Sequence, residues 1–555
     1  MIQTDGNRTL VKTQRLEAEF EGVSLVSLRN AAGRSLVKRK SESPGLAARF
    51  GAREWLPIGT DAYARTSTVQ AGARLVHVHV EDHNADACLR ISVDDEGRLL
   101  VEPSAHSARR GLAAVRWNVA GIADDLKLVA PLFQGCRMAL DHPLVADADH
   151  AWPMCWEAAL AVMQGSDCGF SICAHDTASR PKSLHVGQPA DAQTLGFDTQ
   201  VHGPAHDGVA VGSLAWIVDT HEGDWQIPAE AYRSWWRRHI GHEELQRLRP
   251  DWVGDIRLAL QWAGNKPEVL DAVAAIIDPK SVLVHASAWR RDPYDVNYPD
   301  YIAGEEGAAF LQHGIDKGFL MMPHHNYFAI DPNHPAYRKL HEFVMREFGT
   351  GKLMGWRWKQ GYVQIPQSWS GMKGLQDEKL MMYLHAGASA WRRLLVEQIA
   401  RAAAAHRLAA VFVDQTLCSF NPDNALVENL SSVEGMVALT RELTDLDGPL
   451  AVGGEGLNEM NVRYQSFAQA HLFNSHQKNC EHFTELDPVP VGDFLYGDLC
   501  KSMGYTNLAG DTPETAWRLE VHERLNALPS LVVRKPEDIQ APNPAVSRVL
   551  ERALS

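Results

Sequence analysis

The spacing of short segments changes near residue 225, and this change limits the folds open to the chain. Before it, short alternating apolar runs recur, and Gly, Asp, Asn and Pro separate them roughly every ten residues. Such spacing is typical of an all-β sandwich. Beyond residue 225, strand-like and helix-like stretches alternate, which is typical of an α/β fold with a parallel sheet. The length of 555 residues also exceeds what one hydrophobic core usually holds, so two or three domains are expected.

The first part of the chain, residues 1–224, is predicted to be the β-sandwich. A helical connector is expected over residues 225–250, with Pro228 at a helix start. The predicted sandwich strands lie at 16–25, 73–80, 99–101, 112–119, 160–163 and 209–218.

Residues 251–555 are predicted to form a (β/α)8 TIM barrel, because eight strand-like runs alternate with helices. The expected strands are 256–262, 281–285, 318–322, 409–413, 449–453, 468–473, 493–496 and 531–534. The expected helices are 267–277, 335–348, 390–406, 432–446, 513–528 and 544–554. The long connection between the third and fourth strands is rich in His and Trp, so it is expected to cover a site.

Charge narrows the possible partners. Lys and Arg total 54 against 69 Asp and Glu, a net charge of -15, which repels phosphate backbones and anionic lipids. No apolar run approaches the roughly 20 residues that span a bilayer. The N-terminal residues show neither the basic nor the apolar region of a secretory signal. We therefore expect no nucleic acid or membrane partner and a cytoplasmic location.

The sequence contains two groups of residues that could bind a metal or form disulfides. His77 and His79 fall on one face of the predicted strand 73–80, yet no third ligand is evident nearby. A solvent-facing stripe is therefore the favoured interpretation. The eight cysteines include no C-x-x-C pair, and we interpret them as buried thiols in a reducing compartment.

Two carboxylates follow neighbouring predicted strands of the barrel. Asp414 ends the apolar run Val411-Phe412-Val413, and Glu455 stands between glycines after the next strand. In TIM barrels the chemistry lies at the carboxyl ends of the strands. Retaining glycoside hydrolysis needs two carboxyl groups roughly 5 Å apart, one as nucleophile and one as acid/base. The pair therefore predicts a glycosidase.

Three short motifs resemble those of a group of bacterial glycoside hydrolases: the linker at 223–236, the strand end Phe412-Val413-Asp414, and Gly454-Glu455-Gly456. Within that group the chain is most similar to relatives of the endo- and exo-α-N-acetylgalactosaminidases. The resemblance implies a galactose-mutarotase-like supersandwich packed on a catalytic barrel. It also implies Asp414 as nucleophile and Glu455 as acid/base. The extra carbohydrate-binding modules of the large secreted members are missing, which favours an exo-acting enzyme on small saccharides.

The residues expected to bind substrate lie after the predicted barrel strands and in the long third connection. Trp rings suit the apolar face of a sugar, although core packing at the barrel rim stays open for Trp262 and Trp289. The expected set is Trp262, Trp289, His324, His325, Asn326, Trp356, Arg357, Trp358, Gln415 and His476.

Several alternatives stay open. Glu459 or Glu481 could replace Glu455 as the acid/base. His324 and His325 could form a metal site with Asp331 or His334. The loop that interleaves Asp292, Asp295 and Asp300 with Tyr294, Tyr298 and Tyr301 could clasp sugar hydroxyls or calcium, or simply be solvated.

The expected protein is thus a retaining exo-acting α-glycosidase for terminal galactose-type sugars, N-acetylgalactosamine or galactose. It needs no organic cofactor and no metal, its partner is a carbohydrate substrate, and a homo-oligomer stays open. Asp414 is expected to keep a low pKa, while Glu455 is held protonated. The rivals are a transglycosidase or a glycosidase for another sugar, a non-catalytic carbohydrate-binding protein, and a metal-dependent hydrolase.

Overall fold

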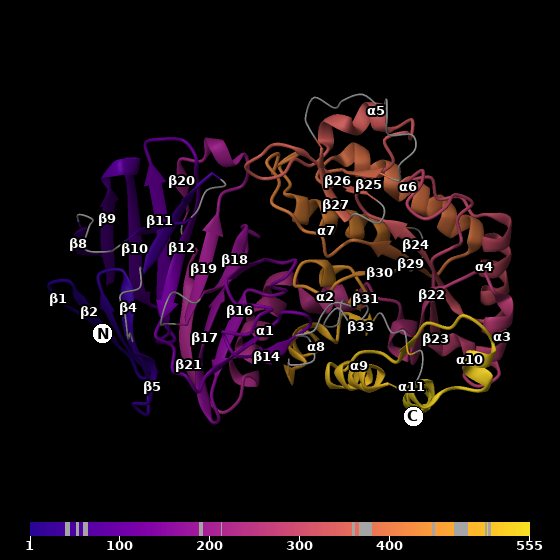
Figure 1. Ribbon diagram of the computed structural model, residues 1–555, viewed down its shortest axis with the longest axis horizontal. Coiled ribbons are helices and arrows are strands. Elements are labelled where there is room, and N and C mark those ends of the chain that lie inside the picture. The colour runs from indigo at the N-terminus through magenta and orange to yellow at the C-terminus, as the bar shows by residue number, and fades with distance from the viewer. Residues whose placement is uncertain are drawn as a thin grey trace.

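The computed structural model describes residues 1–555 except 39–44, 52–54, 59–64, 71, 188–192, 213, 358–360, 366–379, 447–449, 471–486, 505–507 and 509–511. A β-sandwich and a barrel lie side by side, with the sandwich formed by the N-terminal part of the chain (Figure 1). The fold class expected from the sequence is therefore confirmed. No helix in the described part of the chain is long and apolar enough to cross a membrane.

The sandwich is built from three antiparallel sheets. The first contains β1 (Ile2–Asp5), β2 (Arg8–Lys12), β3 (Leu16–Glu21), β4 (Ser24–Asn30) and β5 (Ser35–Lys38). The second has the order β15 (Ala148–Ala151), β18 (Lys182–Gly187), β19 (Thr194–Gln200), β12 (Leu112–Ala120), β6 (Leu46–Phe50) and β7 (Trp55–Ile58). The third runs β32 (Asp487–Pro488), β14 (Cys136–Met138), β13 (Lys127–Ala130), β16 (Leu160–Gln164), β17 (Cys168–Ala174), β21 (Trp216–Glu222), β11 (Leu99–Ser107), β10 (Ala85–Val93), β9 (Ala73–Val80) and β8 (Arg65–Gln70), with β20 (Ala210–Val211) beside β11.

Large aromatic side chains fill the space between two of these sheets. Trp117 on β12 and Phe197 on β19 come from the six-stranded sheet, and Trp216 on β21 comes from the eleven-stranded one. The rings of Phe197 and Trp216 lie 5.1 Å apart, and those of Trp156 and Trp216 stack at 6.2 Å. All are fully buried, so the alternation along each strand places one face in this core.

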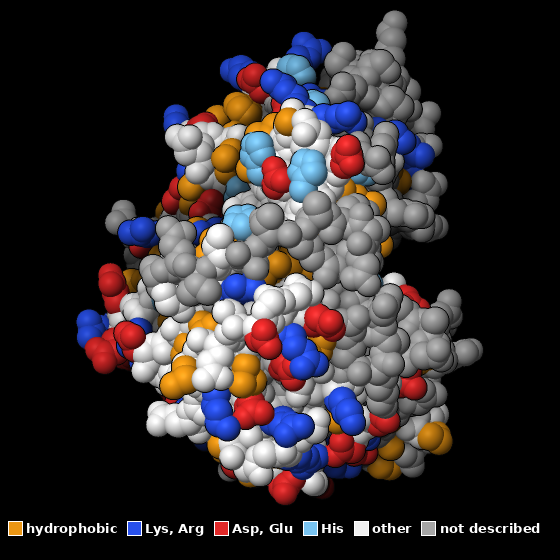
Figure 2. Space-filling view, turned by 90° about the vertical axis from the view of Figure 1, so that its left-hand side faces the viewer, with side chains coloured by type: hydrophobic (Ala, Val, Ile, Leu, Met, Phe, Trp, Pro, Cys, Tyr) orange, Lys and Arg blue, Asp and Glu red, His pale blue; other side chains and the backbone are white. Residues whose placement is uncertain are grey.

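Histidine side chains gather beside acidic ones on the exposed end of the sandwich (Figure 2). On the exposed face of β9, Nδ1 of His79 lies 2.8 Å from Asp86, and Nε2 of His77 lies 4.0 Å from the Cys88 sulfur. Among the described residues no group of three His, Cys, Asp or Glu side chains is placed to hold a metal ion. The solvent-facing interpretation of His77 and His79 therefore fits their placement. None of the cysteines described is in a disulfide.

The connector joins the sandwich to the barrel through buried polar contacts. It contains α1 (Gln226–Ile240) and α2 (His242–Arg247). From α1, the Tyr232 hydroxyl donates to the carboxylate of Glu459 in the barrel and accepts the Ala159 N–H of the sandwich at 3.2 Å. The Trp152 indole N–H donates to the other oxygen of Glu459. Strand β32, which follows the sixth barrel strand in sequence, pairs with β14 and extends a sandwich sheet.

The barrel is a parallel sheet of eight strands that is closed by one further hydrogen bond. Its order is β33 (Lys501–Gly504), β31 (Phe467–Ala470), β30 (Ala451–Glu455), β29 (Ala410–Asp414), β24 (Leu320–Asn326), β23 (Val282–Ala286), β22 (Leu258–Ala263) and β34 (Ser530–Leu531). The Leu528 N–H, two residues before β34, donates to the Ser502 carbonyl of β33 at 2.8 Å.

Helices surround this sheet, and a small sheet covers one end (Figure 1). The helices are α3 (Pro267–Ala274), α4 (Glu305–Lys317), α6 (Ser389–His406), α7 (Ser432–Thr444), α8 (Val491–Tyr496), α9 (Pro513–Arg524), α10 (Glu537–Gln540) and α11 (Pro544–Leu554). The long third connection carries α5 (Tyr337–Leu340) and a four-stranded sheet of β25 (Ala329–Ile330), β28 (Leu380–Tyr383), β26 (Leu353–Arg357) and β27 (Gly361–Ile365).

Two sequence predictions about barrel elements were wrong, and one helix was missed. Residues 493–496, predicted as the seventh strand, belong to α8, because a four-residue apolar run fits a buried helix as well as a strand. The predicted helix 335–348 is broken: only α5 and the 3-10 helix His341–Phe343 are helical. The Met345 N–H donates to the Tyr383 carbonyl in the small sheet, and this tertiary pairing overrides helix propensity. Helix α4 was not predicted at all.

Candidate active site

A cavity of about 690 Å³ opens at the carboxyl ends of the barrel strands. This volume is in the range of small-molecule sites. Trp356 and Met381 of the small sheet form one wall, while Trp262, His324 and Asp414 come from barrel strands. The complete lining is Trp262, Ser287, Ala288, Arg290, Arg291, Asp292, Pro293, Tyr294, Asp295, Tyr298, His324, Trp356, Met381, Asp414 and Gln415.

The register of three adjacent parallel strands places Asn326, Asp414 and Glu455 in one row. Asn326 is paired with Asp414, and the residue pair Val413–Gly454 sets Asp414 level with Glu455. Neighbouring strands lie about 4.8 Å apart, so these side chains stand side by side. Asp414 is 8% exposed and Glu455 7%, and both are the last residues of their strands.

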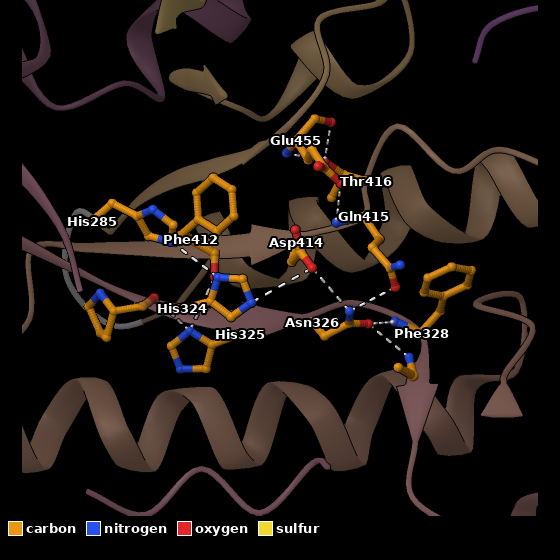
Figure 3. A network of polar contacts seen from close by, with 12 residues as sticks. His285, His324, His325, Asn326, Phe328, Phe412, Asp414, Gln415, Thr416 and Glu455 are labelled. Atoms are coloured by element: carbon orange, nitrogen blue, oxygen red, sulfur yellow. Dashed lines mark hydrogen bonds and ion pairs between the residues drawn. The ribbon is translucent and has the colours of Figure 1, made fainter. Parts of the chain in front are cut away.

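Hydrogen bonds hold the row in place (Figure 3). The Asn326 amide donates to Gln415 Oε1 at 2.9 Å and lies 3.5 Å from Asp414 Oδ2. The Gln415 backbone N–H donates to Glu455 Oε2 at 3.2 Å. Thr416 Oγ1 donates to the Glu455 carbonyl and accepts the Glu455 N–H, each at 2.9 Å. The two carboxylates are therefore fixed on one hydrogen-bonded frame.

Gln415 directly after the nucleophile candidate has an unusual backbone. Its φ is +63°, in the left-handed region that non-glycine residues rarely adopt. Such conformations persist where surrounding contacts enforce them, often at functional sites. Here the conformation presents the Gln415 side chain to the cavity and its N–H to Glu455.

The electrostatics of Asp414 differ from the expectation of a low pKa. Burial is the largest cause and raises the pKa of Asp414 well above its usual range, and the negative charges of Glu455 and Asp295 add to this. Hydrogen bonds from Gln415 and Asn326 oppose the shift. Two adjacent buried carboxyls cannot both ionise easily, so the pair favours sharing a single proton.

The sequence placed His324, His325 and Asn326 after the third barrel strand. They instead form the end of that strand, β24. Successive side chains of a strand point to opposite faces. His324 accordingly lines the cavity, while Nδ1 of His325 lies 3.0 Å and 3.3 Å from the carbonyls of Pro323 and Phe412. His325 is thus placed in the barrel wall, away from the cavity lining.

Of the other predicted binding residues, some line the cavity and others do not. Trp262, Trp356 and Gln415 line the cavity. Trp289 is fully buried and its indole N–H donates to the His324 carbonyl at 2.9 Å. Arg357, next to Trp356 on β26, is not in the cavity lining. Trp358, His476 and Glu481 lie outside the described residues.

Glu459, one alternative acid/base, lies at the sandwich junction. Both of its carboxylate oxygens accept hydrogen bonds there, from Trp152 and Tyr232, and burial raises its pKa. Of the glycines beside Glu455, Gly454 allows close packing inside the barrel, because a Cβ there would collide with Gln465 and Thr416.

Two features in or beside the cavity were underestimated from the sequence. The acidic-aromatic loop after β23 contributes Asp292, Tyr294, Asp295 and Tyr298 to the lining, and its regular interleaving was the available signal. His285 was not singled out, although a histidine inside the apolar run 282–286 is an unusual feature. Its ring nitrogen Nε2 lies 3.1 Å from Nδ1 of His324.

The fold and cavity define a class: a β-sandwich joined to a TIM barrel with two carboxylates at strand ends four and five. A family model described as "Domain of unknown function (DUF6259)" matches residues 212–429. No curated protein sequence matches the chain.

Solved structures share the architecture. The α-N-acetylgalactosaminidase NagBb from Bifidobacterium bifidum is similar over 100% of this chain and 93% of its own, with a TM-score of 0.66 and 12% identity. Its Gal-NHAc-DNJ complex gives a TM-score of 0.68 at 11% identity, covering 100% and 92% of the two chains. The GH36 α-galactosidase AgaB from Geobacillus stearothermophilus covers 100% and 87%, with a TM-score of 0.47 and 9% identity. The similarity to NagBb shows the shared fold over the whole chain.

Proposed function

We propose that this protein is a retaining, exo-acting α-glycosidase that hydrolyses terminal α-linked galactose-type sugars, N-acetylgalactosamine or galactose, from small saccharides or glycoconjugates. The observation that carries the proposal is the row of Asp414 and Glu455 at adjacent strand ends beside a cavity of about 690 Å³. The galactose-type specificity draws on the fold shared with NagBb, an α-N-acetylgalactosaminidase.

In this proposal Asp414, which faces the cavity, attacks the anomeric carbon as a carboxylate. Glu455 donates a proton to the leaving oxygen, so the glycosidic bond breaks as the glycosyl ester with Asp414 forms. Glu455, now ionised, then takes a proton from water, whose oxygen attacks the same carbon and releases Asp414. The shared proton of the pair suits these alternating roles, because binding of substrate has only to place it on Glu455.

The aromatic walls suit the substrate class. Trp262, Tyr294 and Trp356 line the cavity, and such rings stack on the apolar face that galactose-type sugars present. Arg290 and Arg291 with Asp292 supply charged groups for hydroxyls at the same wall.

Substitution of the two carboxylates tests the proposal. Asp414→Asn is expected to lower kcat on aryl α-galactosides and aryl α-N-acetylgalactosaminides on the order of 10⁴-fold, because no nucleophile remains. Glu455→Gln should keep activity on a good leaving group and lose it on a poor one, and azide should partly rescue turnover on the good leaving group.

The controls separate the alternatives. Glu481→Gln made in parallel shows which glutamate is the acid/base: near-normal activity of Glu455→Gln on a poor leaving group, with loss in Glu481→Gln, moves that role to Glu481. Cleavage confined to β-glycosides contradicts the α assignment, and cleavage of α-glucosides alone contradicts the galactose-type one. Sugar binding without turnover by the wild-type protein would favour a binding protein.

A further inference from the structure

Two buried histidines form a chain that leads to Asp414. His285 Nε2 lies 3.1 Å from His324 Nδ1, and His324 Nε2 lies 3.7 Å from Asp414 Oδ2. Figure 3 shows the His324 ring between His285 and Asp414. His285 comes from β23 and packs against Phe412, with ring centres 4.2 Å apart.

Both imidazoles are neutral in this environment. Burial is the main cause and lowers the pKa of His285 to about 3, and it lowers the pKa of His324 well below its usual range. A neutral imidazole carries one N–H and one bare nitrogen. The contact between the rings therefore holds one proton, and whichever ring donates it determines the tautomer of His324.

The neighbouring charge decides between the two arrangements. If His285 donates, the proton of His324 sits on Nε2 and faces Asp414. If His324 donates, its bare Nε2 lone pair faces the negative charge shared by Asp414 and Glu455, which is unfavourable. The first arrangement is therefore preferred, and the hydrogen bond from His285 holds it.

His324 Nε2 is buried, yet it has no hydrogen-bond partner among the described residues. A buried donor without a partner is costly. Since His324 lines the cavity, a bound ligand can satisfy this donor. We propose that His285 fixes the tautomer of His324, and that the Nε2–H of His324 donates to the oxygen of the substituent at C2 of the sugar in subsite –1.

The position of Asp414 points to the C2 substituent as the acceptor of the His324 hydrogen bond, an assignment that rests on the proposed function. Asp414 attacks C1, so a donor 3.7 Å from its carboxylate lies close to the groups beside C1, the ring oxygen and the C2 substituent. The ring oxygen becomes positive in the oxocarbenium-like transition state and would reject a donor. The C2 hydroxyl or the acetamido carbonyl accepts one. His324 is thus a substrate-binding residue and His285 a positioning residue.

Matched variants at position 285 test the proposal. His285→Phe keeps an aromatic ring against Phe412 but removes the donor. His285→Gln places an amide N–H near the position of the imidazole Nε2. The tautomer of His324 is read directly by 15N NMR of protein labelled on histidine, with the His324 signals identified by their loss in His324→Asn. This measurement needs no substrate turnover, so it stands even if the glycosidase proposal fails.

We expect Nε2 of His324 to carry the proton in the wild type and in His285→Gln. In His285→Phe we expect a mixture of the Nδ1–H and Nε2–H tautomers. A proton on Nδ1 in the wild type would overturn the proposal. On a substrate with its C2 substituent, His285→Phe should lower kcat/KM about tenfold to a hundredfold, and His285→Gln should recover most of it. On the matching 2-deoxy substrate, which lacks the C2 substituent, His285→Phe should change kcat/KM little. An equal loss of kcat/KM on both substrates would refute the role at C2.

Discussion

The half-buried carboxyl of Glu157, at the junction of sandwich and barrel, should contribute less to the stability of this protein as pH rises. Glu157 of the sandwich accepts hydrogen bonds from the Gln134 N–H at 2.9 Å and from Gln134 Nε2 at 3.0 Å, and its carbonyl accepts the Glu459 N–H from the barrel. Burial raises the pKa of Glu157 from its ordinary 4.5 to about 8, although the bonds from Gln134 oppose this.

The sign and size of the effect follow from proton linkage. Between pH 4.5 and about 8 the folded protein keeps a proton that the unfolded chain has released. The contribution of Glu157 to the free energy of unfolding therefore decreases as pH rises through this window, and it is constant below it. The full slope is about 1.4 kcal/mol per pH unit. Because Glu157 keeps part of its surface exposed, we expect about 1 kcal/mol per unit.

Glu157→Gln removes this titration. In urea unfolding followed by tryptophan fluorescence at several pH values across the window, the variant should gain about 1 kcal/mol per pH unit relative to wild type. The control is Glu551→Gln, at an exposed position of α11, which should follow the wild type. Parallel pH profiles of Glu157→Gln and wild type would refute the buried, neutral carboxyl.

Two further substitutions test the cavity wall and the junction. Trp356→Ala should raise KM for aryl α-glycosides roughly tenfold with a smaller change in kcat, because one stacking wall is lost. The control is Tyr362→Ala, which should leave KM unchanged, because Tyr362 pairs with Trp356 from β27 but lies outside the cavity lining. Glu459→Ala should lower the free energy of unfolding by about 2–4 kcal/mol, since the Trp152 and Tyr232 donors lose their acceptor. A loss below about 0.5 kcal/mol in chemical denaturation would contradict the role of Glu459 as a structural acceptor at the junction.

Several elements were predictable because their signals are local. The helices at 390–406, 432–446 and 544–554 have strong apolar periodicity, and α6, α7 and α11 begin within one residue of those positions. The strand that ends at Asp414 was evident as an apolar run closed by a carboxylate. Segments 335–348 and 493–496 were mispredicted because their structure depends on partners distant in the sequence, such as Tyr383.

The sequence by itself determined the sandwich-plus-barrel class and the positions of Asp414 and Glu455 at strand ends, because strand alternation and helix periodicity are properties of neighbouring residues. Only the tertiary structure decided which side chains meet. The register of β24, β29 and β30 brings Asn326 level with both carboxylates, places His324 in the cavity and turns His325 into the wall. The same long-range packing sets His285 against His324 and draws Glu459 to the sandwich, since strand register and domain contacts depend on the whole fold.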